Sequence, residues 1–263
     1  MKNTTAAGGG TDKHSRHPPP MLRLLPTRIA DGPTQMSLDE ALLVHAATPT
    51  VRLYGWQPAT LSLGYFQAWE DIAGKLPGNM AVVRRITGGG AIWHEHEVTY
   101  SLVGRLGENG LPTSTKAIYP GLHRAVLEAL GRRGATVAVQ PETVGDRRYR
   151  DDPRCFASPA ADDLIHHAGG KILGSAARAR GTQVLIHGSL KLASNPWDGA
   201  AVAPCGLHWD QAAEALLEGI SSWLGQPTTP GTTTVAEDTT AAELATLRYG
   251  TDAWVRHRQG PKA

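Results

Sequence analysis

The 263-residue sequence predicts an α+β fold in which a mixed, largely antiparallel sheet is flanked by helices. Short segments with alternating apolar and polar residues dominate the first two thirds of the chain, whereas helical periodicity occurs in single, separated segments. The 30 glycines and 18 prolines indicate frequent turns and argue against long helices. We therefore expect one domain over residues 21–263, preceded by a disordered tail over residues 1–20.

The strands are predicted from period-two alternation between turn residues. The first 20 residues are rich in Gly, Thr and Pro and show no periodicity, which is typical of disorder. From Leu22 onward the pattern is that of a folded domain. Strands are predicted at 22–25, 51–54, 60–65, 81–84, 91–94, 99–103 and 136–139.

The second part of the chain adds a hairpin and helices. Two strands, 163–167 and 171–176, are joined by Ala168-Gly169-Gly170, a sequence typical of a hairpin turn, and a further strand follows at 183–192. Apolar residues at helical spacing predict helices at 35–46, 115–131, 210–224 and 240–249. Thr34 or Ser37 is expected to cap the first helix and Ser114 the second, and the Pro- and Thr-rich segment 226–234 is expected to be a linker.

Composition excludes several classes of function. The 26 basic and 24 acidic residues give a net charge of +2, too balanced for a protein that binds nucleic acid by electrostatics. No apolar run approaches the ~18 residues that a membrane helix needs, and the N-terminus shows no apolar signal segment. Two cysteines cannot form a dense disulfide framework. These observations predict a soluble cytoplasmic protein without nucleic-acid or membrane partners.

A glycine-rich segment, Arg84-Arg85-Ile86-Thr87-Gly88-Gly89-Gly90-Ala91, lies between two predicted strands. Three consecutive glycines let backbone N–H groups approach an anion or a carbonyl closely, and the arginines supply positive charge. The segment lacks the Gly-Lys-Ser/Thr ending of a Walker loop, and no helix follows it. The alternative is a tight turn with solvated arginines.

One cysteine and one lysine stand out by their surroundings. Cys155 lies in a polar, turn-like segment beside Arg154, which favours a partly exposed thiolate, although a free cysteine is more often an inert core residue. Lys171 lies among small and apolar residues, where a buried ammonium needs a thiolate, a carboxylate or a substrate carbonyl as partner. The alternative for Lys171 is a strand-edge side chain that reaches water. Cys205 is expected to be structural.

The segment His94-Glu95-His96-Glu97 contains metal-ligand residue types. In a strand, His94 and His96 would share one face, but no further ligand cluster and no His-Glu-x-x-His spacing accompanies them. We therefore expect no metal site.

Taken together and in order, six segments resemble the biotin/lipoate A/B protein ligase superfamily over residues 22–255. They include the glycine-rich segment and the lysine strand, and no single one of them is specific. The segments are Met36-Ser37-Leu38-Asp39-Glu40, Arg52-x-Tyr54-Gly55-Trp56, Leu61-Ser62-Leu63-Gly64-Tyr65-Phe66-Gln67, Arg84-Arg85-x-Thr87-Gly88-Gly89-Gly90-Ala91, Lys171-Ile172-Leu173-Gly174-Ser175-Ala176 and His187-Gly188-Ser189-Leu190.

Two further segments resemble the cysteine-dependent octanoyl-[acyl-carrier-protein]:protein N-octanoyltransferase branch of that superfamily. They are His94-x-x-Glu97-Val98-Thr99-Tyr100-Ser101 and Cys155-Phe156-Ala157-Ser158-Pro159, the latter at the position of the acylated cysteine. Gly90 and Glu95 depart from the usual pattern, because those transferases often carry Arg and Asp there.

The resemblance implies an α+β catalytic domain that transfers octanoyl from acyl carrier protein to a lysine of a lipoyl domain. The acceptor would be the glycine cleavage H protein or a 2-oxoacid dehydrogenase E2 subunit. Cys155 would carry the acyl group as a thioester, Lys171 would stabilise the thiolate and the carbonyl oxygen, and no ATP or other cofactor is implied. The implied substrate-binding residues are Arg85, Gly88, Gly89, Gly90, His94, Gly174, Ser175, Ala176, His187 and Gly188.

Three alternatives remain open from the sequence. An ATP-dependent lipoate-protein ligase would use the glycine segment and Lys171 for an acyl-adenylate, and Cys155 would be incidental. An amidotransferase would move octanoyl between lipoyl domains, also through a cysteine. A catalytically silent relative would only bind acyl chains or acylated proteins.

Overall fold

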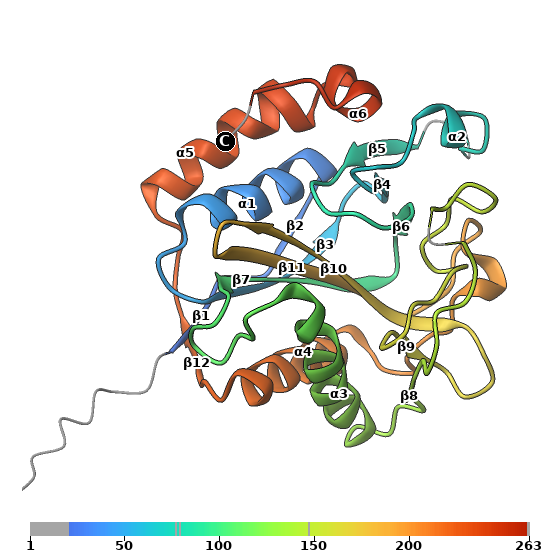
Figure 1. Ribbon diagram of the computed structural model, residues 1–263, viewed down its shortest axis with the longest axis vertical. Helices are drawn as coiled ribbons and strands as arrows, with labels where there is room; N and C mark the ends of the chain where they lie inside the picture. The colour runs from blue at the N-terminus through green and yellow to red at the C-terminus, as the bar shows by residue number, and fades with distance from the viewer. Residues whose placement is uncertain (1–20, 77, 79, 147, 262–263) are drawn as a thin grey trace, which may run out of the picture.

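The computed structural model describes residues 21–261 except 77, 79 and 147, so the tail predicted at 1–20 lies outside the described residues (Figure 1). Its larger sheet has the strand order β12-β1-β3-β7-β11-β10-β9-β8, with β2 paired to β3. The strands are β1 (Leu22–Leu24), β2 (Arg28–Ala30), β3 (Thr50–Trp56), β7 (Glu97–Arg105), β8 (Ala138–Val139), β9 (Leu164–Ile165), β10 (Lys171–Arg180), β11 (Gln183–Lys191) and β12 (Thr228–Pro230).

Most strand pairs of this sheet are antiparallel. The long central strands β3, β7, β11 and β10 all pair antiparallel, and β9 and β8 continue the same pattern. Parallel pairing is limited to the other end, where β1 pairs with β12 and β3, and β2 pairs with β3. The predicted mixed, largely antiparallel sheet is therefore confirmed.

A smaller sheet stands against one end of the larger one (Figure 1). Its central strand β4 (Thr60–Leu63) pairs parallel with β5 (Ala81–Arg84) and antiparallel with β6 (Ile92–His94). The glycine-rich segment connects β5 to β6, so it crosses between the two outer strands of this sheet.

Helices cover both faces of the larger sheet (Figure 1). On one face lie α3 (Ile118–Gly131), preceded by the 3-10 turn η1 (Thr115–Ala117), and α4 (Trp209–Leu224). On the other face lies α1 (Gly32–His45), with α5 (Val235–Leu244) packed over it. Four shorter helical segments complete the described chain: α2 (Glu70–Ala73), η2 (Gly199–Ala201), the π-helical η3 (Ala245–Tyr249) and α6 (Asp252–His257).

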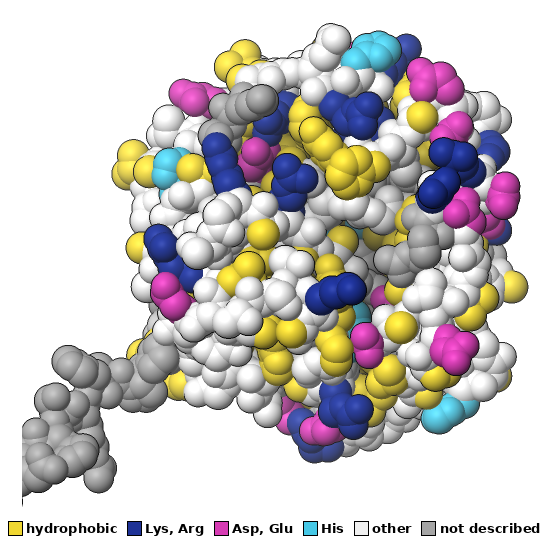
Figure 2. Space-filling view, in the orientation of Figure 1, with side chains coloured by type: hydrophobic (Ala, Val, Ile, Leu, Met, Phe, Trp, Pro, Cys, Tyr) yellow, Lys and Arg dark blue, Asp and Glu magenta, His cyan; other side chains and the backbone are white. Residues whose placement is uncertain are grey.

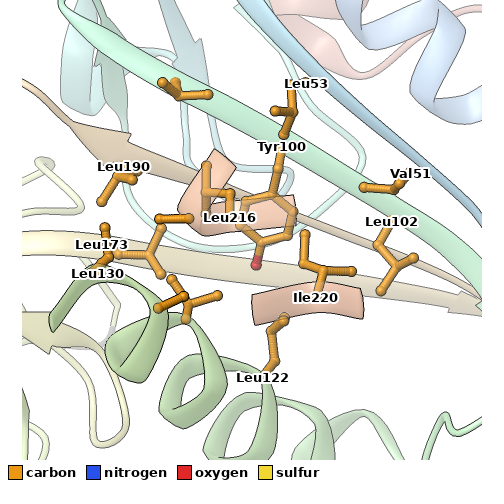
Figure 3. Close-up of a cluster of buried hydrophobic side chains, with 14 of the residues drawn as sticks. Val51, Leu53, Tyr100, Leu102, Leu122, Leu130, Leu173, Leu190, Leu216 and Ile220 are labelled. Atoms are coloured by element: carbon orange, nitrogen blue, oxygen red, sulfur yellow. The ribbon is translucent and has the colours of Figure 1, made fainter. Parts of the chain in front are cut away.

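The main core lies between the larger sheet and the pair α3–α4 (Figure 3). Each large aliphatic side chain that is fully removed from water there contributes about 1.5–3 kcal/mol before the entropy of ordering is subtracted. The sheet and helix side chains that meet in this layer include Val51, Leu53, Tyr100, Leu102, Leu122, Leu130, Leu173, Leu190, Leu216 and Ile220.

The predicted cap of the first helix is wrong. The helix starts at Gly32, and its N-cap is Asp31, whose side chain accepts a hydrogen bond of 2.9 Å from the backbone N–H of Thr34. Neither Thr34 nor Ser37 is the cap, because Pro33 suits the first helical turn and starts the helix several residues earlier.

Two other predicted helix starts also differ. Ser114 makes no side-chain cap bond, since a 3-10 turn separates it from α3. The helix predicted from residue 240 begins at Val235, where Thr234 and Glu237 form a capping box. The segment predicted as a linker contains β12, whose three residues are too few to show alternation.

No helix within the described residues combines the length and the apolar character that crossing a membrane requires.

The close packing of α3 on α4 can be tested at Gly219. A Cβ there would lie 2.7 Å from the Cα of Val126, a backbone atom of α3 that cannot move aside alone. We expect Gly219→Ala to lower the free energy of unfolding by about 1–3 kcal/mol, as overpacking does. Urea denaturation of this variant and of a matched control measures the change in the free energy of unfolding.

Gly131→Ala is the matched control, because a Cβ at this helical position meets nothing within 4 Å. It should leave stability unchanged or raise it by about 0.5–1 kcal/mol. Equal effects of the two substitutions would contradict the proposed close contact between the helices.

Candidate active site

A cavity of about 400 Å³ lies between the two sheets, and most of the predicted site residues line it. Register explains part of this convergence, because Ala176 of β10 lies opposite His187 of β11 and Gly174 lies opposite Ser189. The predicted residues that line the cavity are Arg85, Gly88, Gly89, His94, Cys155, Lys171, Gly174, Ser175, Ala176, His187 and Gly188.

Cys155 is a free, partly buried thiol held by its backbone against the start of β6. The N–H of Ala91 donates to the carbonyl of Pro153 (2.7 Å), and the N–H of Cys155 donates to the carbonyl of Ala91 (2.8 Å). Gly90 does not line the cavity but lies behind this segment, where a Cβ would come within 2.8 Å of the Cys155 nitrogen. The lack of a side chain at Gly90 thus lets the cysteine segment approach.

Lys171 is a buried cation that lies against the thiol. Its Nζ lies 3.8 Å from the Sγ of Cys155 and 2.8 Å from an Oδ2 of Asp163, and the side chain is only 3% exposed. Burial alone would lower the pKa of Lys171, but the negative charges of Cys155 and Asp163 raise it above its usual value. Lys171 therefore remains an ammonium at neutral pH and cannot act as a base there.

Asp163 was not singled out from the sequence. It stands at the start of a strand that precedes the hairpin turn, and its carboxylate also accepts a 2.6 Å hydrogen bond from the N–H of Ala160. The sequence could have pointed to it, because a buried lysine requires an anion. Any acidic residue on the neighbouring strand was therefore a candidate partner for Lys171.

Arg85 is a second buried cation at the site. It donates to the carbonyls of Gly88 (2.9 Å) and Gly90 (2.7 Å) and to Ser62, and it forms no ion pair with a described residue. Burial lowers the pKa of Arg85, and the charge of Cys155 opposes this effect. The guanidinium thus holds the glycine segment by its carbonyl oxygens.

Gly89 joins this arginine to the cysteine. Its φ is +96°, a conformation that favours glycine, and a Cβ would lie 2.9 Å from an Nη of Arg85 and 4.0 Å from the Cys155 Sγ. In the part of the chain that is described, the N–H groups of Gly88 and Gly89 donate to no protein atom. The backbone at Gly88 and Gly89 therefore offers unpaired donors beside the thiol.

The expected role of Arg154 is wrong. Its guanidinium pairs with Asp152 at 2.6 Å and donates to the carbonyl of Trp197, so its charge is already compensated. Cys205, in contrast, lies in the main core and is 2% exposed, and burial raises the pKa of its thiol.

His187 is fixed by two hydrogen bonds at the floor of the cavity. Its Nδ1 lies 3.1 Å from an Oδ2 of Asp39, and its Nε2 lies 2.6 Å from the hydroxyl of Thr87. Burial would raise the pKa of Asp39, but Arg52 and His187 lower it to about 2. Asp39 is thus ionised and accepts a hydrogen bond from Nδ1 of His187, while Nε2 shares a hydrogen bond with the hydroxyl of Thr87.

His94 is held in the same manner. Its Nδ1 lies 2.7 Å from Glu97 and its Nε2 lies 2.7 Å from the hydroxyl of Ser62, while its ring stacks on Trp56. Burial lowers the pKa of His94 to about 4, although Glu97 opposes this shift, so the ring is neutral at pH 7. Among the described residues, no three His, Cys, Asp or Glu side chains are grouped to hold a metal ion.

The floor of the cavity contains side chains that the sequence did not identify as site residues. They are Met36, Tyr54, Trp56, Ser62, Ile92, Thr99 and Ser189. They come from six separate segments and were predictable only as members of buried strands or of α1.

Curated relatives match most of the chain. An octanoyltransferase LipM of Moorella thermoacetica is 37% identical over 187 residues, which cover 68% of each chain. An octanoyltransferase LipM of Symbiobacterium thermophilum is 32% identical over 270 residues, covering 88% of this chain and 97% of the relative.

Solved structures agree on the fold. The crystal structure titled as lipoate-protein ligase A bound with ATP superposes with a TM-score of 0.74 at 22% identity, covering 90% of this chain and 98% of the other. The sequence profile of the lipoyl protein ligase A/B catalytic domain matches residues 31–209. The chain belongs to the lipoyl protein ligase A/B catalytic domain family.

Proposed function

We propose that this chain is an octanoyltransferase of lipoate biosynthesis. It takes the octanoyl group from a thioester of acyl carrier protein and passes it to a lysine of a lipoyl domain, with Cys155 as the intermediate carrier. The observation that carries the proposal is the free Cys155 thiol 3.8 Å from the buried Lys171 ammonium, in a cavity bordered by the glycine segment. The octanoyltransferase names of the relatives support the same reaction.

In the first half-reaction, the Cys155 thiolate attacks the thioester carbonyl of the donor. A new C–S bond forms, the old C–S bond breaks, and the donor leaves as a thiolate that takes a proton from solvent. Negative charge develops on the carbonyl oxygen, which the N–H groups of Gly88 and Gly89 and the Lys171 ammonium stabilise.

In the second half-reaction, the acceptor lysine attacks the acyl-enzyme as a neutral amine. A C–N bond forms, the Cys155 thiolate leaves, and the amine loses its extra proton to solvent. Because Lys171 stays protonated, it stabilises the departing thiolate in this step as it stabilised the attacking thiolate in the first.

The acceptor belongs to the class of lipoyl-domain proteins, with the glycine cleavage H protein or a dehydrogenase E2 subunit as the specific candidates. One solved relative with the same fold is described as a bipartite lipoate protein ligase studied with its E2 lipoyl domain. The apolar side chains Met36, Trp56 and Ile92 suit the hydrocarbon chain of the transferred group.

The proposal predicts a covalent adduct on one cysteine. Mixing the protein with octanoyl-acyl carrier protein should add one octanoyl group, and intact-protein mass spectrometry with peptide mapping should place it on Cys155. Cys155→Ala should abolish the adduct, and Cys205→Ala should keep it if the protein folds. Hydroxylamine should release the adduct, as it does for a thioester.

An adduct on Cys205, or one that resists hydroxylamine, would contradict the thioester mechanism. Transfer of free octanoate that requires ATP and survives Cys155→Ala would assign the chain to the ATP-dependent ligases instead.

A second prediction concerns Lys171. Lys171→Ala should slow acyl-enzyme formation by ~10²–10³, because removing one donor to a developing oxyanion has this cost. It should also slow alkylation of Cys155 by iodoacetamide at pH 7, since a neighbouring cation favours the thiolate. Lys171→Arg should keep much of the alkylation rate but recover little transfer, because a planar fork replaces a compact ammonium.

Thermal unfolding of the same variants serves as the control for folding. An unchanged alkylation rate in folded Lys171→Ala would show that this lysine does not activate the thiol.

A third prediction concerns the glycine segment. Gly89→Val should remove transfer, because the side chain would point toward Arg85 and the Cys155 sulfur and occupy the place of the thioester carbonyl. The φ of +96° adds backbone strain, so a stability loss of about 1–2 kcal/mol is expected as well. Normal single-turnover transfer by this variant would reduce the segment to a structural turn.

A further inference from the structure

A second cavity, of about 340 Å³, opens beside the active site and carries positive charge. Figure 2 shows Lys and Arg side chains gathered around hydrophobic ones in the upper part of this face. Four arginines line the cavity together with Tyr65 and Trp254: Arg178, Arg180, Arg248 and Arg258.

Three of these arginines lack a counter-ion. Arg248 pairs with the carboxylate of Glu40. Arg178, Arg180 and Arg258 form no ion pair with any residue that the structure describes, and all three are exposed. The guanidinium of Arg178 lies 5.4 Å from the centre of the Tyr65 ring and that of Arg258 lies 5.8 Å from it, so the two flank one aromatic side chain.

The strand β10 connects this cluster to the thiol. Side chains alternate along a strand, so Arg178 and Arg180 project from the same face of the sheet as Gly174 and Ala176, which line the active-site cavity. At a rise of ~3.3 Å per residue, Arg178 is ~13 Å and Arg180 ~20 Å along the strand from Gly174. Gly174 itself lies against Lys171, because a Cβ there would be 2.4 Å from the Lys171 Nζ.

An exposed aromatic side chain lies between lining residues of the two cavities. Phe66 is 72% exposed, and it packs edge-on against Tyr65 with 5.1 Å between ring centres. A Cβ at Gly88 would lie 3.7 Å from the Phe66 ring, so Phe66 also borders the glycine segment. Phe66 therefore lies between Tyr65, which lines the second cavity, and Gly88, which lines the active-site cavity.

We propose that Arg178, Arg180 and Arg258 bind the phosphate of the acyl donor while its thioester, at the far end of a phosphopantetheine arm, reacts with Cys155. This inference rests on the proposed octanoyl transfer from a thioester donor. Arginine forks match phosphate geometry and hold it with charge-assisted hydrogen bonds. The acceptor is a poor candidate for the same cluster, because the lysine that it presents offers no anionic group for these arginines to pair with.

Acyl carrier protein and coenzyme A both carry this arm and its phosphate, so either one could supply the group that the arginines bind. The experiment compares three donors: octanoyl-acyl carrier protein, octanoyl-coenzyme A and octanoyl-pantetheine, which lacks the phosphate. Acyl-enzyme formation on Cys155 is followed for each donor by quenched-flow mass spectrometry. The natural source is the phosphorylated donor with the higher kcat/KM in the unaltered protein.

The test variant is the double substitution Arg178→Ala with Arg180→Ala, and Arg258→Ala is measured separately. Loss of charge-assisted hydrogen bonds of this type weakens binding by about 10-fold to 100-fold. We therefore expect kcat/KM to fall by that factor for both phosphorylated donors. It should stay within about twofold for octanoyl-pantetheine, and added salt should weaken use of the phosphorylated donors only. Arg124→Ala, an exposed arginine of α3 on the opposite face of the sheet, is the matched control and should change nothing.

The remaining outcomes overturn the inference. Equal losses with all three donors would give these arginines a structural role. A loss with the carrier protein alone would assign them to its protein surface rather than to the phosphate. Normal acyl-enzyme formation with slower discharge to a lipoyl domain would assign them to the acceptor. If no donor acylates the unaltered protein, the proposed transfer itself fails, which is a distinct result.

Discussion

The active-site half of the fold depends on burying two cations next to one thiol. Moving an ammonium or a guanidinium out of water is costly unless an anion or several hydrogen bonds compensate it. Lys171 has Asp163 for this purpose, whereas the partners of Arg85 among the described residues are the carbonyl oxygens of the glycine segment and the oxygens of Ser62. Cys155 lies close enough that its interaction with Arg85 opposes the lowering of the Arg85 pKa by burial, so the cysteine and the buried guanidinium are coupled by charge.

This arrangement requires glycine at several positions, because the neighbouring atoms leave no room for a Cβ. At Gly64 a Cβ would lie 1.8 Å from the carbonyl oxygen of Gly89, so β4 and the glycine segment touch through backbone alone. At Gly174 a Cβ would occupy the space of the Lys171 side chain. The glycines, whose number predicts frequent turns, therefore also serve at these positions to bring backbone and charge together.

The sequence predicted most of the fold and the central pair of the site, but not the way the site is supported. Alternation located the long strands, since each has one face buried in the main core. Cys155 and Lys171 were identified as candidates from their neighbouring residues, and the resemblance of six segments, in the correct order, to a known superfamily supported the choice. Arg154 was chosen because it is adjacent in sequence, yet its guanidinium pairs with Asp152. Asp163 and the role of Arg85 were missed, because which charge meets which depends on how β9 and β5 are placed against Cys155, and a single sequence does not give that placement.

The histidines near the cavity are held by hydrogen bonds at both ring nitrogens, so the cations of the cavity are its lysine and arginine side chains. His94, His123 and His187 each have one ring nitrogen on an acid or a backbone carbonyl and the other on a hydroxyl. Burial also lowers the pKa values of His94 and His123, which keeps both rings neutral near pH 7. A hydrocarbon chain entering the cavity thus meets polar groups that are already paired with protein partners.

Among the described residues, positive charge without an ion-pair partner then remains at Arg85 beside the glycine segment and, ~13–20 Å along β10 from Gly174, at the exposed arginines. In the proposed reaction, a thioester donor develops negative charge on its carbonyl oxygen and carries an anionic phosphate at the far end of its arm. That distribution of charge on a substrate is the complement of the one that β10 carries.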